Sequence, residues 1–275
     1  MNFNEVVEGI KKLHIQGASA IAKKGVMAFA KYVSSGNDLK KDIEYAKKEL
    51  FKARPTEPML VNGINYMIGK AKKKEDFIKI AEKLVKLKEE SEEKISELGA
   101  SLIKDGMNIF THCHSSSVIR VLKKAKEQGK KFNVVCFETR PLFQGRVTAK
   151  ELTDLGIRTT LTIDSAMTES FDVFPPDLIL VGCDAITKTF FVNKIGTETL
   201  AIIAKKHKIP FYVCTETFKY TDNLRIEQRK REEIWKEAPE KLNIWNPAFD
   251  TISNKLITGF ITQLGMKKGI KCLSW

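Results

Sequence analysis

Short apolar runs alternate with helical segments from about residue 105 onward, and this alternation constrains the fold more than any other feature of the chain. Each run has the length of a buried strand, and apolar residues between the runs recur at helical spacing. The expected strands lie at residues 107–110, 132–137, 159–163, 178–181 and 210–214, with helices near residues 115–128, 148–155 and 197–206. Strands and helices in this order form a parallel sheet with right-handed crossovers, so the sequence predicts an α/β fold with helices flanking the sheet.

The residues before this region have helical periodicity alone. Phe77, Ala81 and Leu84, for example, mark the apolar face of a long helix. We therefore expect two domains, a helical N-terminal domain over residues 1–104 and an α/β domain over residues 105–275. With 275 residues, 43% of them hydrophobic, the chain is long enough and apolar enough to form both cores.

No apolar run approaches the ~20 residues that a membrane-spanning helix needs, and the N-terminus lacks the features of a signal peptide. The five cysteines are widely spread without a Cys-x-x-Cys pair, which argues against a disulfide framework or a zinc site. His112, Cys113 and His114 are consecutive on an extended segment, so they point to opposite faces and cannot easily clasp one metal. We expect a cytoplasmic protein without membrane contact, metal or cofactor.

The formal net charge of +13, from 47 basic and 34 acidic residues, suits nucleic acid, an acidic protein or anionic substrates. Most lysines alternate with glutamates along the helices, and basic clusters such as residues 72–74 and 229–231 are interpreted as solvated faces. The sequence has no specific nucleic-acid motif that interleaves aromatic and basic residues. A general nucleic-acid role therefore stays open, but no motif of the sequence indicates one.

The sequence THCHSSS at residues 111–117 joins the first expected strand to the helix that follows it. Such a turn presents free backbone N–H groups and the hydroxyls of Ser115, Ser116 and Ser117, an arrangement that favours binding of an anion. Cys113 supplies a nucleophile or base beside them. This combination indicates chemistry on a phosphorylated metabolite.

Four further polar groups follow the other expected strands, at residues 138–146, 164–166, 182–197 and 216–219. Ligands in parallel α/β folds bind beyond these carboxyl ends. Near lysines and a helix N-terminus, the thiol of Cys113 is expected to have a lowered pKa and to accept a proton from carbon. A carboxylate in a dry pocket can stay protonated and donate to an oxygen. An acid and a base around an anchored sugar phosphate are what aldose–ketose isomerisation requires.

Each of these residues also has a purely structural explanation. A single cysteine at a strand end, as at Cys113, is commonly a small buried hydrophobe, and an aspartate after a strand, as at Asp184, is commonly a turn or cap residue. Residues 193–197 can be no more than the start of a helix with Thr197 as its N-cap. The joint pattern, rather than any single motif, indicates a site.

Seven motifs occur in order along the chain, at residues 15–20, 54–56, 111–117, 138–141, 182–184, 193–197 and 246–250. In this order they resemble one family, the alpha, beta and delta subunits of translation initiation factor 2B, which also contains methylthioribose-1-phosphate isomerase and ribose-1,5-bisphosphate isomerase. The chain looks most like the archaeal initiation-factor-2B-like proteins. The resemblance implies a helical N-terminal domain, a Rossmann-like C-terminal domain and a homodimer or higher homo-oligomer.

In the isomerases of this family, a cysteine in the Thr-His-Cys motif abstracts the substrate proton, and an aspartate in the Gly-x-Asp motif is its acid partner. The resemblance places these catalytic roles at Cys113 and Asp184. The family's substrate and phosphate contacts map onto Gly17, Ala18, Arg54, Ser115, Ser116, Ser117, Asn193, Lys194 and Lys219. The eukaryotic regulatory subunits generally lack the cysteine–aspartate pair, so its presence here favours a working active site.

Two positions depart from the isomerases of the family. Gln16 stands where they typically have an arginine, so one cation for phosphate is missing. The loop expected between Asp184 and Asn193 carries Lys-Thr-Phe-Phe at residues 188–191, where relatives often have a glycine-containing turn. Both differences bear on how the pocket grips a phosphate and closes over it.

The sequence leaves two functions open. The first is a metal-free aldose–ketose isomerase acting on a ribose-1-phosphate derivative. In it Cys113 takes the C2 proton, Asp184 shuttles protons at the ring oxygen, and phosphate docks at the Ser115 turn. The second is a non-catalytic regulatory subunit that binds initiation factor 2 through its alpha subunit and senses a sugar phosphate or nucleotide. The retained pair of Cys113 and Asp184 favours the isomerase, whereas Gln16 favours regulation.

Overall fold

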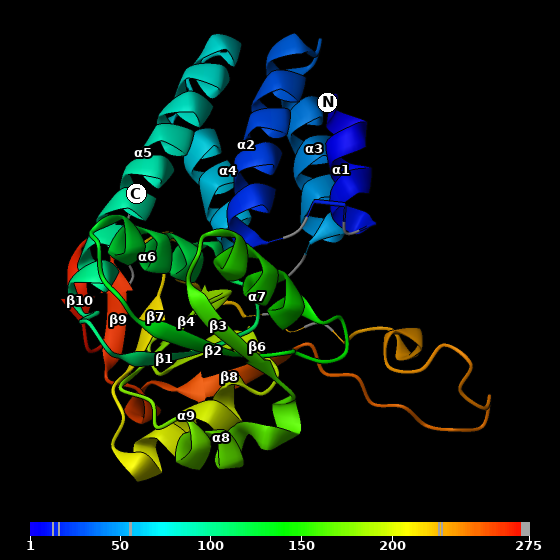
Figure 1. Cartoon of the computed structure of the whole chain (residues 1–275). Helices are drawn as coiled ribbons and strands as arrows, with labels where there is room; N and C mark the ends of the chain where they lie inside the picture. Colours follow the sequence, from blue (N-terminus) through cyan, green and yellow to red (C-terminus); the bar gives the residue numbers. More distant parts are fainter. Residues whose placement is uncertain (13, 16, 55–56, 225, 227, 271–275) are drawn as a thin grey trace.

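The computed structural model describes residues 1–12, 14–15, 17–54, 57–224, 226 and 228–270. Within these residues a bundle of helices stands on one side of a seven-stranded sheet (Figure 1). The bundle helices are α1 (Phe3–Lys11), α2 (Ala18–Ser35), α3 (Leu39–Ala53), α4 (Pro58–Lys70) and α5 (Lys74–Ser101). The predicted order, a helical region followed by a parallel sheet flanked by helices, is therefore confirmed.

Local sequence signals and apolar faces explain the bundle. At the start of α1, the Asn2 side chain accepts from the Glu5 N–H at 2.9 Å and the Glu5 carboxylate accepts from the Asn2 N–H at 2.8 Å. Such a cap is worth about 1 kcal/mol to a helix. The apolar faces then converge on Phe29, Leu60 and Phe77, whose side chains are buried. The bundle therefore has a core of its own.

The long helix α5 belongs to two cores. Phe77 and Leu84, in its first half, pack in the bundle, whereas Ile95 and Ala100, in its second half, pack against α6 and the sheet. Gly99 permits close contact with α6, because a Cβ there would lie 2.5 Å from a methyl group of Val121. The boundary expected at residue 104 lies shortly after the end of this helix and stays a prediction.

The main sheet has the order β10-β9-β7-β4-β1-β2-β3. Its strands are β1 (Asn108–His112), β2 (Asn133–Phe137), β3 (Arg158–Thr162), β4 (Leu178–Val181), β7 (Phe211–Cys214), β9 (Gly259–Thr262) and β10 (Gly265–Lys267). The five strands expected from the apolar runs are β1, β2, β3, β4 and β7, and neighbouring ones pair in parallel. Strand order reverses between β1 and β4, so a crevice opens beyond their carboxyl ends.

Helices cover both faces of this sheet, as Figure 1 shows. On the face toward the bundle, Ile109 packs with residues of α6, and on the opposite face, Phe110 packs with Phe171 of α8 and Leu200 of α9. The flanking helices are α6 (Ser116–Glu127), α7 (Gln144–Asp154), α8 (Met167–Val173) and α9 (Thr197–His207). Alternate burial on two faces explains why the strands are continuous apolar runs.

One helix begins earlier than its sequence suggests. It was expected to start at residue 148, but α7 starts at Gln144, and Thr148 lies inside it. The helix start packs directly on the end of β2: a Cβ on Gly145 would lie 1.7 Å from the carbonyl oxygen of Phe137. From sequence alone, a glycine such as Gly145 indicates a loop. Here Gly145 lies in the helix and permits close contact with β2.

The expected loop between Asp184 and Asn193 is a hairpin, so that expectation is wrong. Strands β5 (Ala185–Ile186) and β6 (Phe190–Lys194) pair antiparallel, and β8 (Phe249–Ser253) pairs with β6 to complete a second, three-stranded sheet. Phe191 is fully buried in the core below the main sheet. The two apolar residues that made the loop look unusual are thus part of a strand.

Residues 228–247 form an excursion that projects from the body of the molecule, drawn in orange in Figure 1. A bridge between Gln228 and Pro247 closes its base. Trp235 and Trp245 are exposed on it. None of the helices in the described residues has the extended apolar stretch that spanning a bilayer requires.

Candidate functional site

A cavity of about 180 Å³ lies where strand order reverses, with Cys113 after β1 and Asp184 after β4 on its wall. The bundle covers it from the other side, through the start of α2 and the end of α3. Its lining residues are Gly17, Ala18, Ile21, Arg54, Cys113, His114, Leu142, Gln144, Asp184, Asn193, Lys194, Arg229, Ala248 and Phe249. Motifs from both ends of the chain therefore meet in one pocket.

Seven of the residues expected from the sequence line this cavity: Gly17, Ala18, Arg54, Cys113, Asp184, Asn193 and Lys194. Gln16, where the family arginine is absent, lies outside the described residues. The remaining four expected residues, Ser115, Ser116, Ser117 and Lys219, are not among the described residues that line the cavity.

The three serines begin α6 and serve that helix. The Ser115 hydroxyl is the N-cap acceptor for the Val118 N–H, and the Ser117 side chain is buried. A Cβ on Gly182, at the end of β4, would lie 2.4 Å from the Ser115 Oγ. The Gly-x-Asp motif thus begins with glycine because the β1 and β4 turns are in contact there. Phosphate binding by these serines stays a prediction.

The backbone of Cys113 is held in an unusual conformation by its neighbours. Its φ of 68° lies in the left-handed region, which a cysteine adopts only when its surroundings compensate. The Cys113 N–H donates to the Thr139 Oγ at 3.0 Å, and the Thr148 hydroxyl donates to the Cys113 carbonyl at 2.9 Å. Thr139 is fixed in turn by Asp164, which accepts from its N–H at 2.9 Å. The polar groups after β2 and β3 therefore support the thiol.

Burial raises the pKa of the Cys113 thiol to about 11. The Lys194 ammonium opposes this rise, and the negative charge of Asp184 adds to it. The lowered pKa expected from the sequence is therefore wrong, because removal of the thiol from water outweighs the nearby cation. The thiol needs a local proton acceptor to become a base.

The histidines on either side of Cys113 diverge. The Nε2 of His112 donates to the Ile195 carbonyl at 2.8 Å, and the Nδ1 of His114 lies 3.1 Å from the Thr148 hydroxyl. Burial lowers the pKa of both imidazoles, so both are neutral at pH 7. They orient the turn and contribute no positive charge to the pocket.

The start of α9 is already occupied by a carboxylate. Asp250 accepts from the N–H groups of Gly196 at 2.8 Å and Glu198 at 2.9 Å. Gly196 is the N-cap, and Thr197, expected in that role, donates its hydroxyl to the Lys194 carbonyl at 2.6 Å instead. This arrangement fixes the backbone of Lys194 and leaves its side chain at the cavity.

Cations outnumber carboxylates on the cavity wall. Among the described residues that line it, Arg54, Lys194 and Arg229 occur together with a single carboxylate, that of Asp184. Arg229 comes from the base of the excursion, where it is held by an ion pair with Glu233. Its interpretation as part of a solvated face was wrong, because a basic cluster in a loop carries no signal of where the loop folds back.

Beneath the cavity lies a buried group of charges that the sequence did not indicate. Lys219 donates to the Cys183 carbonyl at 2.8 Å and lies 3.4 Å from Glu216. Glu57 is buried beside them, and Arg54 and Asp184 are also near enough to affect its charge. The Lys219 ammonium is thus bound to the backbone next to Asp184. A glutamate at the start of a helix, such as Glu57, gives no sequence signal that it will be buried.

Comparisons with known proteins agree with this geometry. The chain matches the Initiation factor 2 subunit family over residues 14–269. It is 36% identical to ribose 1,5-bisphosphate isomerase of Archaeoglobus fulgidus, over 95% of this chain and 88% of that protein. It is 34% identical to methylthioribose-1-phosphate isomerase of Thermosipho africanus, over 96% of this chain and 86% of that protein.

A solved structure is similar across the whole fold. The crystal structure of the Pyrococcus horikoshii translation initiation factor eIF-2B superposes with a TM-score of 0.86 and 31% identity, covering 96% of each chain. The family match, the relatives and this structure agree with the resemblance drawn from the seven motifs. The chain therefore belongs to the Initiation factor 2 subunit family.

Proposed function

We propose that the chain is a sugar-phosphate isomerase that converts an aldose phosphate into the ketose phosphate, with Cys113 as base and Asp184 as acid. The observation that carries this proposal is the meeting of a thiol, one carboxylate and three cations in a cavity at the topological switch point. The names of the similar isomerases support the same reaction class. Anchored phosphate plus a paired base and acid is the equipment that this reaction needs.

The working form is reached when one proton moves from the Cys113 thiol to the Asp184 carboxylate, which leaves the net charge unchanged. The thiolate then takes the C2 proton of the sugar, while protonated Asp184 donates to the ring oxygen as the ring opens. The thiol returns its proton to C1, and Asp184 takes the proton of the C2 hydroxyl as the ketone forms. Both residues end as they began, so no external acid or base is consumed.

The three cations favour a substrate with two phosphates. Lys194 lies beside the acid–base pair, whereas Arg54 and Arg229 come from other walls of the cavity. Two separated phosphates would use this spread of charge, and ribose 1,5-bisphosphate has them. Methylthioribose 1-phosphate has a single phosphate and would engage fewer of these cations.

An Arg229→Gln variant is expected to raise KM for ribose 1,5-bisphosphate at least tenfold with little change in kcat. Loss of one charge-assisted contact to phosphate costs about 1.5–3 kcal/mol in binding. Lys230→Gln is the matched control, because Lys230 is the exposed neighbour of Arg229 and is not a lining residue. Steady-state kinetics of ketose formation check this. Equal KM values for the two variants would contradict the assignment of Arg229.

A second candidate function is supported by the similar crystal structure named as translation initiation factor eIF-2B. In this role the chain would be a regulatory subunit that binds the alpha subunit of initiation factor 2 and senses a sugar phosphate in the same cavity. Cys113 and Asp184 would then bind ligand without turnover. Binding of a sugar phosphate with no isomerisation would favour this alternative.

We also propose that two copies of the chain associate through the edge of the main sheet at β3. This strand ends the sheet, and its Leu161 and the following Ile163 are 43% and 54% exposed. An edge strand with exposed apolar side chains is a surface that proteins normally cover.

A Leu161→Glu, Ile163→Glu double variant is expected to weaken self-association at least a hundredfold, because it would bury two unpaired carboxylates at the interface. Light scattering coupled to size-exclusion chromatography measures the mass in solution. Leu264→Glu is the control, since Leu264 is 52% exposed in the turn between β9 and β10, at the other edge of the sheet. A double variant that keeps the wild-type mass would contradict the proposed interface.

A further inference from the structure

Glu57 is a buried carboxyl group for which no motif of the chain accounts. It is the N-cap residue of α4, yet its side chain accepts no hydrogen bond from the described backbone of that helix. The residue is 2% exposed, and its Oε1 has no hydrogen-bond partner among the described residues. Burial of a carboxyl group without a hydrogen-bond partner lowers the stability of the fold, so its presence here indicates a functional role.

Charged groups from several elements face Glu57. Lys219 and Glu216 come from the short helix η2 (Thr217–Lys219) and the residue before it, Asp184 follows β4, and Arg54 ends α3. Burial raises the pKa of Glu57 to about 8, and Lys219 and Arg54 oppose this while Asp184 and Glu216 add to it. Glu57 is therefore a neutral acid at pH 7, near enough to the proposed catalytic carboxylate for the charge of Asp184 to affect it.

Lys219 connects Glu57 to the strand end that carries Asp184. Its ammonium donates to the carbonyl of Cys183, the residue before Asp184, and forms an ion pair with Glu216. Glu216 lies also 3.5 Å from the buried ammonium of Lys88. The position of the Cys183–Asp184 peptide thus depends on where the Lys219 ammonium is held.

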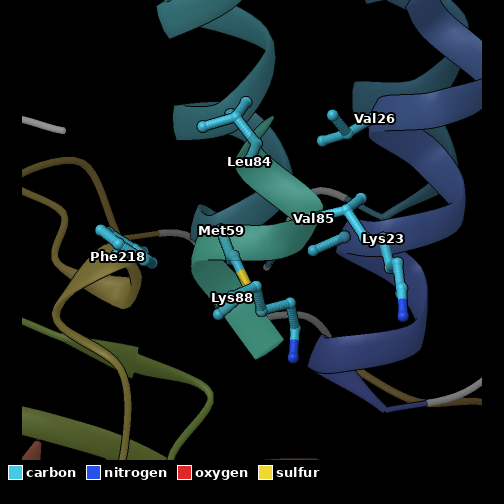
Figure 2. A pocket seen from close by; sticks show the side chains of 9 residues that line it. Lys23, Val26, Met59, Leu84, Val85, Lys88 and Phe218 are labelled. Carbon is cyan, nitrogen blue, oxygen red and sulfur yellow. The ribbon is translucent and has the colours of Figure 1, made fainter. Parts of the chain in front are cut away.

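This buried group is shielded from water by the bundle. Asn62 of α4 donates to the carbonyls of Phe218 at 2.8 Å and Tyr220 at 2.9 Å, which ties η2 to the bundle. A small cavity of about 20 Å³ is lined by Met59, Phe218 and the stem of Lys88, whose side chains are labelled in Figure 2. In such an apolar setting, a change of one charge acts strongly on its neighbours.

We propose that Glu57 is a positioning residue for Asp184, acting through Lys219, and that its protonated form supports turnover. The inference rests on the proposed isomerase function. When Glu57 is protonated, it does not compete for the Lys219 ammonium, which stays bound to the Cys183 carbonyl and to Glu216. Ionised Glu57 would compete for the same ammonium, draw it from the carbonyl and displace Asp184, and it would place a negative charge below a phosphate site.

The test compares kcat/KM of Glu57→Gln and wild type across pH, because their ratio cancels every titration that the two proteins share. Glutamine imitates the protonated acid and cannot ionise. The ratio is expected to stay within about threefold of 1 below pH 7 and to rise about tenfold per pH unit above pH 8. Glu90→Gln, at an exposed position on α5, is the control and should give a ratio independent of pH.

A Glu57→Gln ratio that stays constant across pH, or a variant inactive at every pH, would overturn the inference. Infrared difference spectroscopy of the wild type tests the Glu57 proton without substrate. A band of a protonated carboxyl group, lost above pH 8 and assigned by its absence from Glu57→Gln, is expected. If the wild type shows no turnover at all, the proposed isomerase function fails. Absence of the carboxyl band would separately contradict the claim that Glu57 is protonated.

Discussion

A Cys113→Ser variant is expected to lose turnover by about a hundredfold to ten-thousandfold, the usual contribution of a general base. A serine hydroxyl at this position is far less acidic than the thiol, and burial raises the pKa even of the thiol to about 11. The fold should survive, because the backbone contacts of Cys113 with Thr139 and Thr148 do not involve its sulfur. Sugar-phosphate affinity should change little, since the cations of the cavity remain.

Steady-state kinetics together with calorimetric binding separate these effects. Cys136→Ser is the matched control, because Cys136 is a buried cysteine of β2 that does not line the cavity. Its kcat should stay within about threefold of wild type, although the new hydroxyl in the core costs some stability. Full turnover by Cys113→Ser would show that another group removes the proton.

Between pH 5 and pH 8, Glu57→Gln is expected to gain about 3.5 kcal/mol in the free energy of unfolding relative to wild type, out of about 5 kcal/mol over the whole titration. In the unfolded chain Glu57 ionises near its ordinary pKa of 4.5, whereas in the folded protein its pKa is about 8. Between these values the folded state holds a proton that the unfolded state has lost, so rising pH removes stability from the wild type. A difference of about 3.5 in pKa corresponds to about 5 kcal/mol.

Urea unfolding of both proteins from pH 5 to pH 9 measures this difference. The gap in the free energy of unfolding should be small near pH 5, grow as the pH rises and level off above pH 8. All other ionisable groups titrate alike in the two proteins, so the changing gap belongs to Glu57. A gap that stays constant from pH 5 to pH 8 would mean that Glu57 is ionised in the folded protein.

The parallel sheet could be predicted because both of its faces are covered. Strands such as β2 and β4 are continuous apolar runs, and the helices between them have clear periodicity. The same topology places residues that follow different strands in one crevice, so it predicts that Cys113 and Asp184 lie close together. Here topology, rather than any property of the two residues alone, located the site.

The strands outside this pattern left little signal. β5 has two residues and β10 has three, and β9 begins with a glycine, so none of them shows a readable alternation. β6 follows a polar turn, and its phenylalanines have no pairing partner nearby in the sequence. Its partner β8 lies more than fifty residues further along the chain. Contacts at that separation are set by tertiary packing.

Electrostatics was the least predictable part of the site. The sequence places lysines near Cys113, but the pKa of the thiol is governed by burial, which depends on how the bundle covers the crevice. Arg229 reaches the cavity because its loop folds back at Gln228 and Pro247. Glu57 is buried because α4 meets η2. None of these contacts follows from local sequence.

The most direct test of the isomerase assignment is proton exchange by NMR in deuterated buffer. Wild type and Cys113→Ser are each incubated with ribose 1,5-bisphosphate and with methylthioribose 1-phosphate. We predict deuterium at the carbon next to the carbonyl with the wild type, faster for ribose 1,5-bisphosphate, and its loss in the variant. No exchange with either sugar phosphate despite measurable binding would contradict the assignment and favour a ligand-sensing regulatory subunit.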